Sequence, residues 1–414
     1  MAIVRPFKAL RPDPQYAENV VSLPYDVMNR QEAAEMAKDN PFSYLHVCRA
    51  EIDLPQQENP YDPSVYEKAK ENLNAFADNG VFIREDAPAF YIYRQIMDGR
   101  VQTGIVGCAS IDDYQNNIIK KHELTRHEKE IDRINHFDVC NADTEPVFFT
   151  YKKNERINEI VSNFTDNNRP VYDIVSSDGV AHILWVVKDQ AICREISQLF
   201  AGIDYLYIAD GHHRSASAVK VGLKRREEHP GYTGEEEFNY FMAVIFPDED
   251  LKIFDYNRVV KDLNGYSEDI LFQSIAQNFD LYRPGPKGPY APEERHTFGM
   301  FVGGNWYKLV AKKGTFDEND PIASLDVSIL QNNLLGPILG IGDPRTDKRI
   351  DFVGGIRGLK ELERRATTDM QIAFSLYPVT IGELIAVADA GLLMPPKSTW
   401  FEPKLGSGLF VHEL

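Results

Sequence analysis

The sequence predicts an α/β fold, in the broad sense that includes α+β folds, and three observations predict it. Two predicted hairpins, around Asp98-Gly99 and around Gly303-Gly304-Asn305, each join two apolar runs by a short turn. A third stretch, 206–226, reads as an apolar run, a polar turn and a helix. Because strands and helices follow one another along the chain, we expect a mixed sheet with helices packed on it.

Turns and helix-ending residues place the remaining elements. A helix is predicted over 31–38, because the chain leaves the helical conformation before Pro41. A second helix is predicted over 66–79, with Gly80 just past its end, where glycine is common. In chain order, the other predicted elements are a densely charged, partly helical stretch over 118–135, strands over 146–151, 182–187, 240–246 and 252–256, a loop over 284–289, and helices over 325–335 and 381–390.

Composition bounds the class of protein. The 414 residues are enough for two or three domains or for one elaborated core, and the hydrophobic content of 43% is typical of a globular protein. The net charge of −18, from 45 Lys+Arg and 63 Asp+Glu, argues against a nucleic-acid partner, because such binding depends on neutralising phosphates. A small phosphorylated substrate is compatible with this charge, since one basic pocket is enough to bind it.

Cysteine usage and hydropathy indicate the compartment. Cys48, Cys108, Cys140 and Cys193 lie far apart and form no C-x-x-C pair, which fits a reducing compartment and no zinc site. The first six residues contain no apolar core of signal-peptide length, and no apolar run approaches the roughly 20 residues that span a membrane. We therefore expect a cytoplasmic protein with no membrane partner.

The polar turn between Ile208 and Ala216 has the richest chemistry of the chain. The segment from Ala216 to Arg226 reads as a helix, so the turn lies at a helix N-terminus, where free N–H groups and the helix dipole attract anions. Gly211 can adopt a backbone conformation that other residues avoid. The turn therefore predicts an anion site.

The side chains of this turn fit phosphate chemistry. Arg214 offers a planar fork that matches phosphate, Asp210 can hold a divalent cation such as magnesium, and His212 and His213 add donors. In the alternative interpretation, Asp-Gly is an ordinary turn, Asp210 caps the helix and the histidines lie on the surface. The spacing is not that of a Walker A loop.

Charged residues in the first third of the chain admit two interpretations. The stretch 120–133 contains His122-Glu123, and it is also typical of a solvated helix laced by ion pairs. Arg49, together with Glu51 and Asp53, matches the carboxylate and ammonium groups of an amino acid. The same alternation fits one face of a surface strand, which we favour for Glu51 and Asp53.

Two C-terminal segments combine basic residues with turns. Either of them, 342–355 or 395–404, can bind a phosphate or close over a ligand. The alternatives are a charged hairpin for the first and a rigid proline-rich packing segment for the second. In the second segment, Lys397 and Ser398 are candidate substrate-binding residues.

The sequence Asp-Gly-His-His-Arg at 210–214 resembles the signature of the ParB/sulfiredoxin-like superfamily, and within it the free L-serine kinase branch. Nearly all of the chain resembles a long bacterial and archaeal family, much of it known only as a domain of unknown function, which includes pyrophosphate-dependent serine kinases. The segments that carry this second resemblance are Arg5–Phe7, Pro24–Val27, Asn40–His46, Lys121–Arg126, Thr144–Phe148 and Met394–Thr399.

The resemblance implies a mixed-sheet core of the ParB/serine-kinase type over 101–262, elaborated by an N-terminal α/β segment over 1–100 and a C-terminal one over 263–414. It also implies a phosphotransferase that converts free L-serine to O-phosphoserine, with pyrophosphate or a nucleoside diphosphate as donor and magnesium as cofactor. In such kinases a glutamate of a His-Glu pair upstream of the loop is the catalytic base, and His122-Glu123 has that place here. Its spacing to Asp210 is longer than in the compact kinases.

The resemblance and the residue patterns together define a predicted site. Its residues are Glu123, His122 and Asp210 for catalysis, Asp210 for the metal, Gly211, His212, His213, Arg214 and Arg126 for phosphate, and Arg49, Lys397 and Ser398 for the substrate. Two alternative functions stay open. A ParB-like nucleotide-binding regulator is disfavoured by the acidity and by the lack of a recognisable helix-turn-helix, and a non-catalytic phosphate or amino-acid sensor would need no base.

Overall fold

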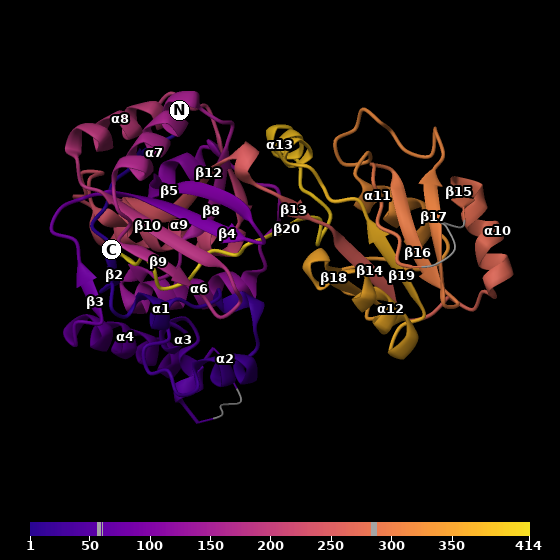
Figure 1. Ribbon diagram of the computed structural model, residues 1–414, viewed down its shortest axis with the longest axis horizontal. Coiled ribbons are helices and arrows are strands. Elements are labelled where there is room, and N and C mark those ends of the chain that lie inside the picture. Colours follow the sequence, from indigo (N-terminus) through magenta and orange to yellow (C-terminus); the bar gives the residue numbers. More distant parts are fainter. Residues whose placement is uncertain (56–58, 60, 283–287) are drawn as a thin grey trace. The chain divides into compact units, whose positions relative to one another are not determined.

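A mixed sheet forms the core of the predicted α/β fold. Its strands are β1 (Val4–Arg5), β4 (Phe90–Met97), β5 (Arg100–Ser110), β6 (Ile119–Lys120), β8 (Val147–Tyr151), β9 (Tyr172–Val175), β10 (Ala181–Val187), β11 (Leu206–Asp210) and β12 (Tyr240–Pro247). The computed structural model describes residues 1–55, 59, 61–282 and 288–414, and within them this nine-stranded sheet has the order β6-β11-β8-β12-β5-β4-β10-β9, with β1 paired to β5 (Figure 1). About 36% of the residues are helical and 25% lie in strands, so the predicted fold class is confirmed.

The hairpin predicted around Asp98-Gly99 is confirmed. β4 and β5 are antiparallel up to the pair Met97↔Arg100. Asp98, with φ 51°, and Gly99, with φ 77°, have the left-handed conformation that a two-residue turn between twisted strands requires at both central positions. β12 extends the sheet beyond this hairpin, antiparallel to β5 and parallel to β8.

The same part of the chain also forms helices. They are α1 (Ala17–Val20), α2 (Arg30–Ala37), α3 (Leu45–Cys48), α4 (Pro63–Asp78), α5 (Ile111–Gln115), α6 (His127–Cys140), α7 (Glu155–Asn167), α8 (Gln190–Phe200) and α9 (His212–Glu228), with 3-10 turns η1 (Tyr25–Val27), η2 (Ala50–Asp53), η3 (Glu237–Asn239) and η4 (Asp248–Asp250). Figure 1 shows α7 and α8 on one side of the strands and α2 to α4 on the other. The helices predicted over 31–38 and 66–79 are confirmed as α2 and α4.

Two buried clusters follow from this arrangement. One joins the sheet to α7 and α8 and includes Phe149, Trp185 and Phe200. The other lies among α1 to α4 and includes Tyr44 and Leu73. Two short sheets complete this part of the chain, one of β2 (Leu10–Pro12) with β3 (Phe82–Arg84) and one of β7 (Ala142–Asp143) with β21 (His412–Glu413).

The described chain divides into two compact units, 1–251 with 403–414, and 252–402. The predicted segments 1–100, 101–262 and 263–414 differ from this division. Residue 100 begins β5, whose pairing with β4 crosses the first predicted boundary. β14 (Tyr256–Val260), which precedes the second boundary, pairs with strands of the second unit. Strand pairing therefore keeps together residues that the predicted boundaries separate.

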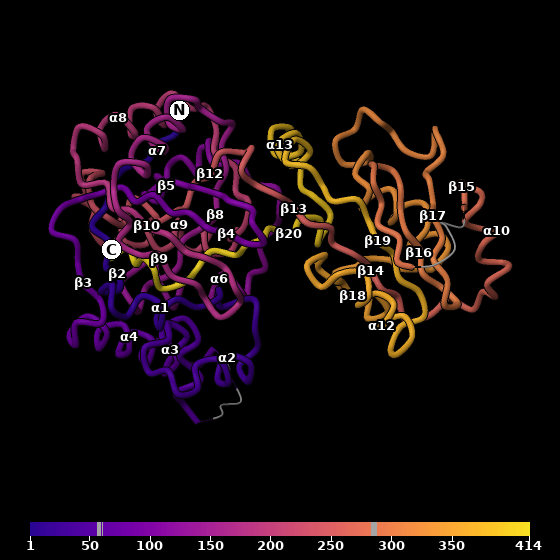
Figure 2. The backbone as a smooth tube through the Cα atoms, viewed as in Figure 1, coloured from indigo at the N-terminus to yellow at the C-terminus, as the bar shows by residue number. Residues whose placement is uncertain are grey.

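The second unit has its own sheet. Its elements are β13 (Ile253–Phe254), β14, α10 (Glu268–Asn278), β15 (Phe279–Tyr282), β16 (Thr297–Val302), β17 (Asn305–Ala311), α11 (Asp326–Leu330), the π-helical turn η5 (Gln331–Leu335), β18 (Ile350–Gly354), the 3-10 turn η6 (Gly355–Arg357), α12 (Leu359–Thr368), β19 (Ile372–Leu376), α13 (Ile381–Asp389) and β20 (Trp400–Phe401). The order β15-β17-β16-β19-β14-β18 makes a six-stranded sheet within the described residues, and Figure 2 traces its backbone.

Most elements predicted for the second unit are present. The hairpin predicted around Gly303-Gly304-Asn305 is confirmed by the pair Val302↔Asn305. The single helix predicted over 325–335 is α11 followed by the π-helical turn η5. Of the predicted loop over 284–289, residues 284–287 lie outside the described residues.

Other sequence-based expectations concern the whole chain. Cys48, Cys108, Cys140 and Cys193 are free and buried. Among the described residues, no helix is both long and apolar enough to cross a membrane.

Gly222 lets α9 pass close to η3. A Cβ atom at this position would lie 2.3 Å from the carbonyl oxygen of Phe238 and 2.9 Å from the side chain of Ile111. Because the nearest atom belongs to the backbone, it cannot move aside as the end of a flexible side chain would. The absence of a side chain at Gly222 therefore helps to place the helix that begins at the 210–214 loop.

Gly222→Ala is expected to lower the free energy of unfolding by about 1–3 kcal/mol, because overpacking outweighs the helix propensity of alanine. Propensity alone predicts the opposite sign, a gain of about 1 kcal/mol. Urea unfolding decides between the two. Gly231→Ala is the control, because a Cβ there meets nothing within 4 Å. A Gly222→Ala protein as stable as the wild type would show that the contact is unimportant.

Candidate active site

The predicted strand, turn and helix around 210–214 are present, and the helix begins at His212 rather than at the expected Ala216. β11 ends at Asp210, Gly211 has φ 91°, and α9 follows at once. A Cβ at Gly211 would meet the Arg214 guanidinium at 3.2 Å, so glycine is needed here for both the turn and the space. As a result, His212, His213 and Arg214 form the first helical turn, where backbone N–H groups have no partner inside the helix.

Asp210 pairs with a lysine from the end of the chain. Its Oδ2 accepts a hydrogen bond from Lys404 Nζ at 2.9 Å, and its Oδ1 accepts one from Gly211 N at 2.8 Å. Burial raises the pKa of Asp210, but the charges of Lys404 and Arg214 and these hydrogen bonds hold it well below its usual range. The carboxylate is therefore ionised at any physiological pH.

Arg214 lies inward, next to the turn. It is 3% exposed, and its Nη1 donates to the carbonyl oxygen of Pro146 at 2.6 Å. Its Nε has no hydrogen-bond partner in the part of the chain that the structure describes. Burial lowers the pKa of Arg214, but the negative charges of Asp26, Glu145 and Asp210 raise it above its ordinary value. The guanidinium keeps its charge and retains an unused donor.

The histidines of the site are neutral, and two of them, His122 and His212, are buried. The rings of His122 and His212 meet edge to face, with centroids 4.4 Å apart. Burial lowers the pKa of His122 to about 4 and that of His212 well below its ordinary value. His213 Nε2 accepts a hydrogen bond from the backbone N–H of Arg126 at 2.9 Å, so its ring proton lies on Nδ1. Uncharged imidazoles can donate or accept here without repelling a cation.

Glu123 lies beside His212. Its Oε2 lies 3.9 Å from His212 Nδ1, and its side chain is 50% exposed. The charged stretch around it is not helical until His127, where α6 begins, so Glu123 and Arg126 lie on the connection between β6 and α6. β6 runs parallel to β11, which brings this connection next to the turn that follows β11.

A second layer of charged residues supports the loop. Arg133 lies under the ring of Tyr25, with 4.0 Å between its Cζ and the ring centroid, and 3.8 Å separates its Nη1 from Glu145 Oε2. Glu145 Oε1 accepts hydrogen bonds from Tyr25 N at 3.2 Å and from Ser407 Oγ at 2.7 Å. Arg133 Nη1 and Glu145 Oε2 make no hydrogen bond within the described residues.

The residues predicted to bind the substrate are Arg49, Lys397 and Ser398, and the structure gives them other contacts. Arg49 Nη1 donates to the carbonyl oxygen of Tyr25 at 2.9 Å, and its Nη2 pairs with Glu51 at 2.8 Å. The surface strand favoured for Glu51 and Asp53 is wrong, because residues 50–53 form the 3-10 turn η2, whose tight turn does not alternate side chains between two faces. Arg49 is therefore a support of the Tyr25 segment.

Lys397 and Ser398 belong to the second unit. The carbonyl oxygen of Lys397 accepts a hydrogen bond from Arg258 Nη2 at 3.0 Å, and Ser398 Oγ donates to the carbonyl oxygen of Pro395 at 2.6 Å. These contacts fit the proline-rich packing interpretation of this segment. In contrast, the structure brings together Asp210, Gly211, His212, His213, Arg214, His122, Glu123 and Arg126 in the first unit.

The predicted site leaves out Lys404, Tyr25 and Glu145, although Tyr25 and Glu145 lie in two of the segments that carry the family resemblance. Lys404 lies within the segment 395–404, but nothing in its spacing distinguishes it from Lys397. It belongs to the strap, the name used here for residues 404–407. The strap returns to the first unit, where the carbonyl oxygen of Lys404 accepts a hydrogen bond from Gln95 Nε2 at 2.7 Å.

The described residues of the site offer few oxygen ligands for a magnesium ion. No group of three or more His, Cys, Asp or Glu side chains is arranged to hold a metal among the residues described. One carboxylate, that of Asp210, faces the turn and is 31% exposed. A single carboxylate is sufficient when phosphate oxygens and water complete the octahedral shell that magnesium prefers.

Comparison with known proteins gives one family and several distant structures. The family described as "Protein of unknown function (DUF1015)" matches residues 4–328. No curated protein matches the chain. SbnI with C-terminal truncation from Staphylococcus aureus is 10% identical, with a TM-score of 0.38 over 74% of this chain and 87% of that chain. A free serine kinase variant in complex with ADP is 12% identical, with a TM-score of 0.36 over 75% and 93%.

Lys404→Met is expected to raise the pKa of Asp210, because burial is then opposed mainly by Arg214. In the wild type the folded-state pKa of Asp210 is depressed below its ordinary value of 3.8, so the stabilisation is present above that pH and is lost as the pH falls through the folded-state pKa. Without magnesium, the variant should lose about 1–3 kcal/mol of unfolding free energy at neutral pH, and less in acid.

Urea unfolding at a series of pH values from neutral to acid measures this difference. Lys404→Arg is the control, because it keeps a cation beside Asp210. A difference between the wild type and Lys404→Met that stays constant down to acid pH would contradict the assigned role of the ion pair.

Proposed function

This chain belongs to the DUF1015 family, and we propose that it is a phosphotransferase whose site is built on the 210–214 loop. The finer proposal is a kinase that converts free L-serine to O-phosphoserine, with pyrophosphate or a nucleoside diphosphate as the donor. One observation carries the proposal: Arg214 and the first N–H groups of α9, which have no partner inside the helix, lie at a turn whose Asp210 is held ionised by Lys404. This combination suits a phosphate group bound with a metal ion.

The donor phosphate would lie at the start of α9. The first N–H groups of that helix and the unused Nε of Arg214 are donors, and the helix dipole adds to their attraction for an anion. Because Arg214 is already fixed by Pro146, it need not reorganise when charge develops on the transferring group. Asp210 would hold magnesium, which when bound neutralises charge on the phosphoryl oxygens.

Glu123 supports the choice of a hydroxyl acceptor. A serine hydroxyl is a weak nucleophile, and a carboxylate within hydrogen-bond reach helps by taking its proton as the oxygen attacks phosphorus. In the balanced step the Oγ–P bond forms, the bond from phosphorus to the leaving phosphate breaks, and the proton moves to Glu123. The half-exposed carboxylate, near neutral His212, is accessible to a small acceptor.

L-serine as the acceptor rests on the resemblance of residues 210–214 to free serine kinases. The full chain should therefore be incubated with L-serine, magnesium and, in separate reactions, pyrophosphate, ADP or ATP, and O-phosphoserine measured by phosphorus NMR. D-serine and glycerol are the control acceptors. Formation of O-phosphoserine from L-serine alone is the expected result. Binding of the donor with no transfer to any acceptor would favour a non-catalytic sensor.

Glu123→Gln is expected to reduce the turnover number by about 10²–10⁴-fold and to leave pyrophosphate affinity nearly unchanged, because the amide cannot take a proton. Steady-state kinetics and calorimetry measure the two quantities. Glu128→Gln is a matched control, since Glu128 is an exposed glutamate in the first turn of α6. Wild-type turnover in Glu123→Gln would assign the base to another carboxylate.

Arg214→Ala is expected to weaken pyrophosphate binding by about tenfold or more, because a charge-assisted hydrogen-bond donor is removed. Because Arg214 is buried, Arg214→Lys is tested beside it, since it keeps the charge and loses the planar fork. Calorimetric titration measures the affinity, and circular dichroism checks the fold. Arg225→Ala, at the far end of the same helix, should bind pyrophosphate as the wild type does. Unchanged affinity in both Arg214 variants would remove this residue from the site.

A further inference from the structure

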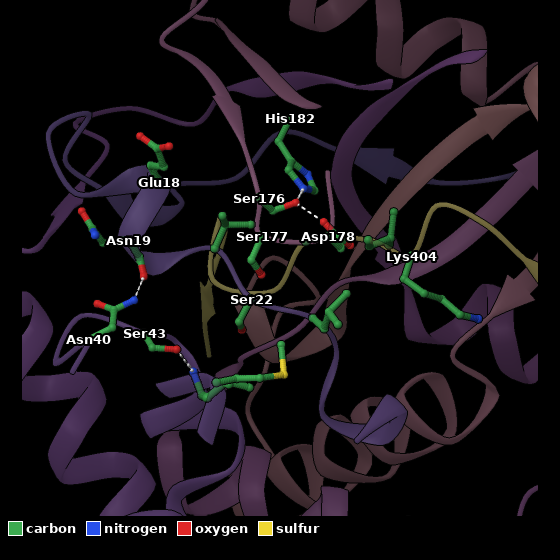
Figure 3. Close-up of a pocket in the computed structure, with 16 residues that line it drawn as sticks. Glu18, Asn19, Ser22, Asn40, Ser43, Ser176, Ser177, Asp178, His182 and Lys404 are labelled. Atoms are coloured by element: carbon green, nitrogen blue, oxygen red, sulfur yellow. Dashed lines mark hydrogen bonds between the residues drawn. The ribbon is translucent and has the colours of Figure 1, made fainter. Parts of the chain in front are cut away.

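A cavity of about 130 Å³ lies within the first unit, beside the strap that carries Lys404. Figure 3 shows the side chains around it, which come from the segments 18–23 and 36–45, from the turn between β9 and β10, from His182 on β10, and from the strap. A cavity of this volume has room for one small metabolite, since about 10–15 Å³ is enough for a single water molecule. None of the chemistry assigned above to the 210–214 loop uses it.

The lining disfavours an anion and favours a ligand with an ammonium group. Two carboxylates line the cavity, those of Glu18 and Asp178. Among the described residues that line the cavity, Lys404 supplies the positive charge, and its ammonium group is bound to Asp210. Burial lowers the pKa of His182 to about 4, so this ring is neutral at physiological pH. The balance of charge at the cavity is therefore negative.

Hydroxyl groups give the cavity hydrogen-bonding capacity. Ser22, Ser43, Ser176 and Ser177 line it, and Ser22 Oγ is buried without a partner in the described part of the chain. Ser176 Oγ donates to Asp178 Oδ1, and 2.8 Å separates it from His182 Nε2, as the dashed lines in Figure 3 show. A ligand with a hydroxyl as well as an ammonium group matches this lining.

Two hydrogen-bonded routes join the cavity to the candidate active site through the strap. On one route, His182 Nδ1 and Tyr93 Oη are 2.5 Å apart, and Tyr93 Oη accepts from Gly406 N at 3.1 Å, two residues from Lys404 and its ion pair with Asp210. On the other, Ser22 and Ser407 exchange backbone hydrogen bonds of 3.1 and 2.8 Å. Ser407 Oγ in turn donates to Glu145.

We propose that this cavity is a binding site for a small amine that also carries a hydroxyl, and that its occupancy changes the affinity of the 210–214 loop for phosphate through the strap. The second part rests on the proposed function, and the first does not. A ligand that displaces the strap residues at the cavity wall changes the position of Lys404, and so the charge that faces the loop. By linkage, pyrophosphate at the loop changes the affinity for the amine by the same factor.

Ethanolamine is the probe for the binding site, titrated into the full chain by calorimetry, with glycolate as the anionic counterpart. We expect ethanolamine to bind and glycolate not to bind. Asp178→Asn should weaken ethanolamine binding by about tenfold or more, because it removes the charge and keeps the shape. Asp173→Asn is the matched control, because Asp173 is exposed on β9 and does not line the cavity. No binding of ethanolamine, or equal binding by Asp178→Asn, would overturn the proposal.

Pyrophosphate affinity with and without saturating ethanolamine tests the coupling. We expect a change of about fivefold or more in the wild type and none in Lys404→Met. An equal change in both proteins would overturn the role of the strap. The two proposals fail separately: ethanolamine binding in a protein that never forms O-phosphoserine refutes the kinase, and O-phosphoserine formation without ethanolamine binding refutes the cavity site.

Discussion

The ion pair between Asp210 and Lys404 joins the 210–214 loop of the candidate active site to the strap. The two residues are 194 positions apart, and they meet because the chain returns to its first unit as the strap. A partly buried carboxylate is costly unless a cation or hydrogen-bond donors accompany it. Lys404 can therefore compensate the charge of Asp210 only when the strap has folded onto the first unit.

The buried charges beyond Asp210 also need neighbours of opposite sign. Arg214, Glu145 and Arg133 follow one another with alternating sign, so each buried charge has an opposite neighbour. Such a series contributes little net stability compared with an apolar core, but removal of any member leaves the next one uncompensated. If the proposed function holds, fixed charges of this kind would receive a phosphate without reorganising.

The sequence was sufficient to predict the loop because its chemistry is contiguous. Gly211 marks the turn, the apolar run before it marks β11, and the residues after it start α9. Lys404 could not be predicted as part of this site, because its proximity to the loop depends on the path of the strap, about which periodicity and turn signals say nothing. Glu51 and Asp53 were wrongly placed on a strand for a local reason, since alternation over a few residues does not distinguish a strand from a 3-10 turn.

Unused hydrogen-bonding groups gather near the loop. Within the described residues, Arg214 Nε, His212 Nε2, Arg133 Nη1 and Glu145 Oε2 are buried without a hydrogen-bond partner, although the last two face each other as an ion pair at 3.8 Å. Each such group costs about 1–3 kcal/mol when it stays unsatisfied, so a protein selected for stability alone would not concentrate four of them here. Three are nitrogens that can donate, which suit the oxygens of a phosphate or a carboxylate, and one is a carboxylate oxygen, which suits an ammonium group. In the proposed reaction, a phosphoryl donor would supply oxygens to the nitrogens, and an amino-acid acceptor would supply an ammonium group to the carboxylate oxygen, which otherwise faces only Arg133 at 3.8 Å.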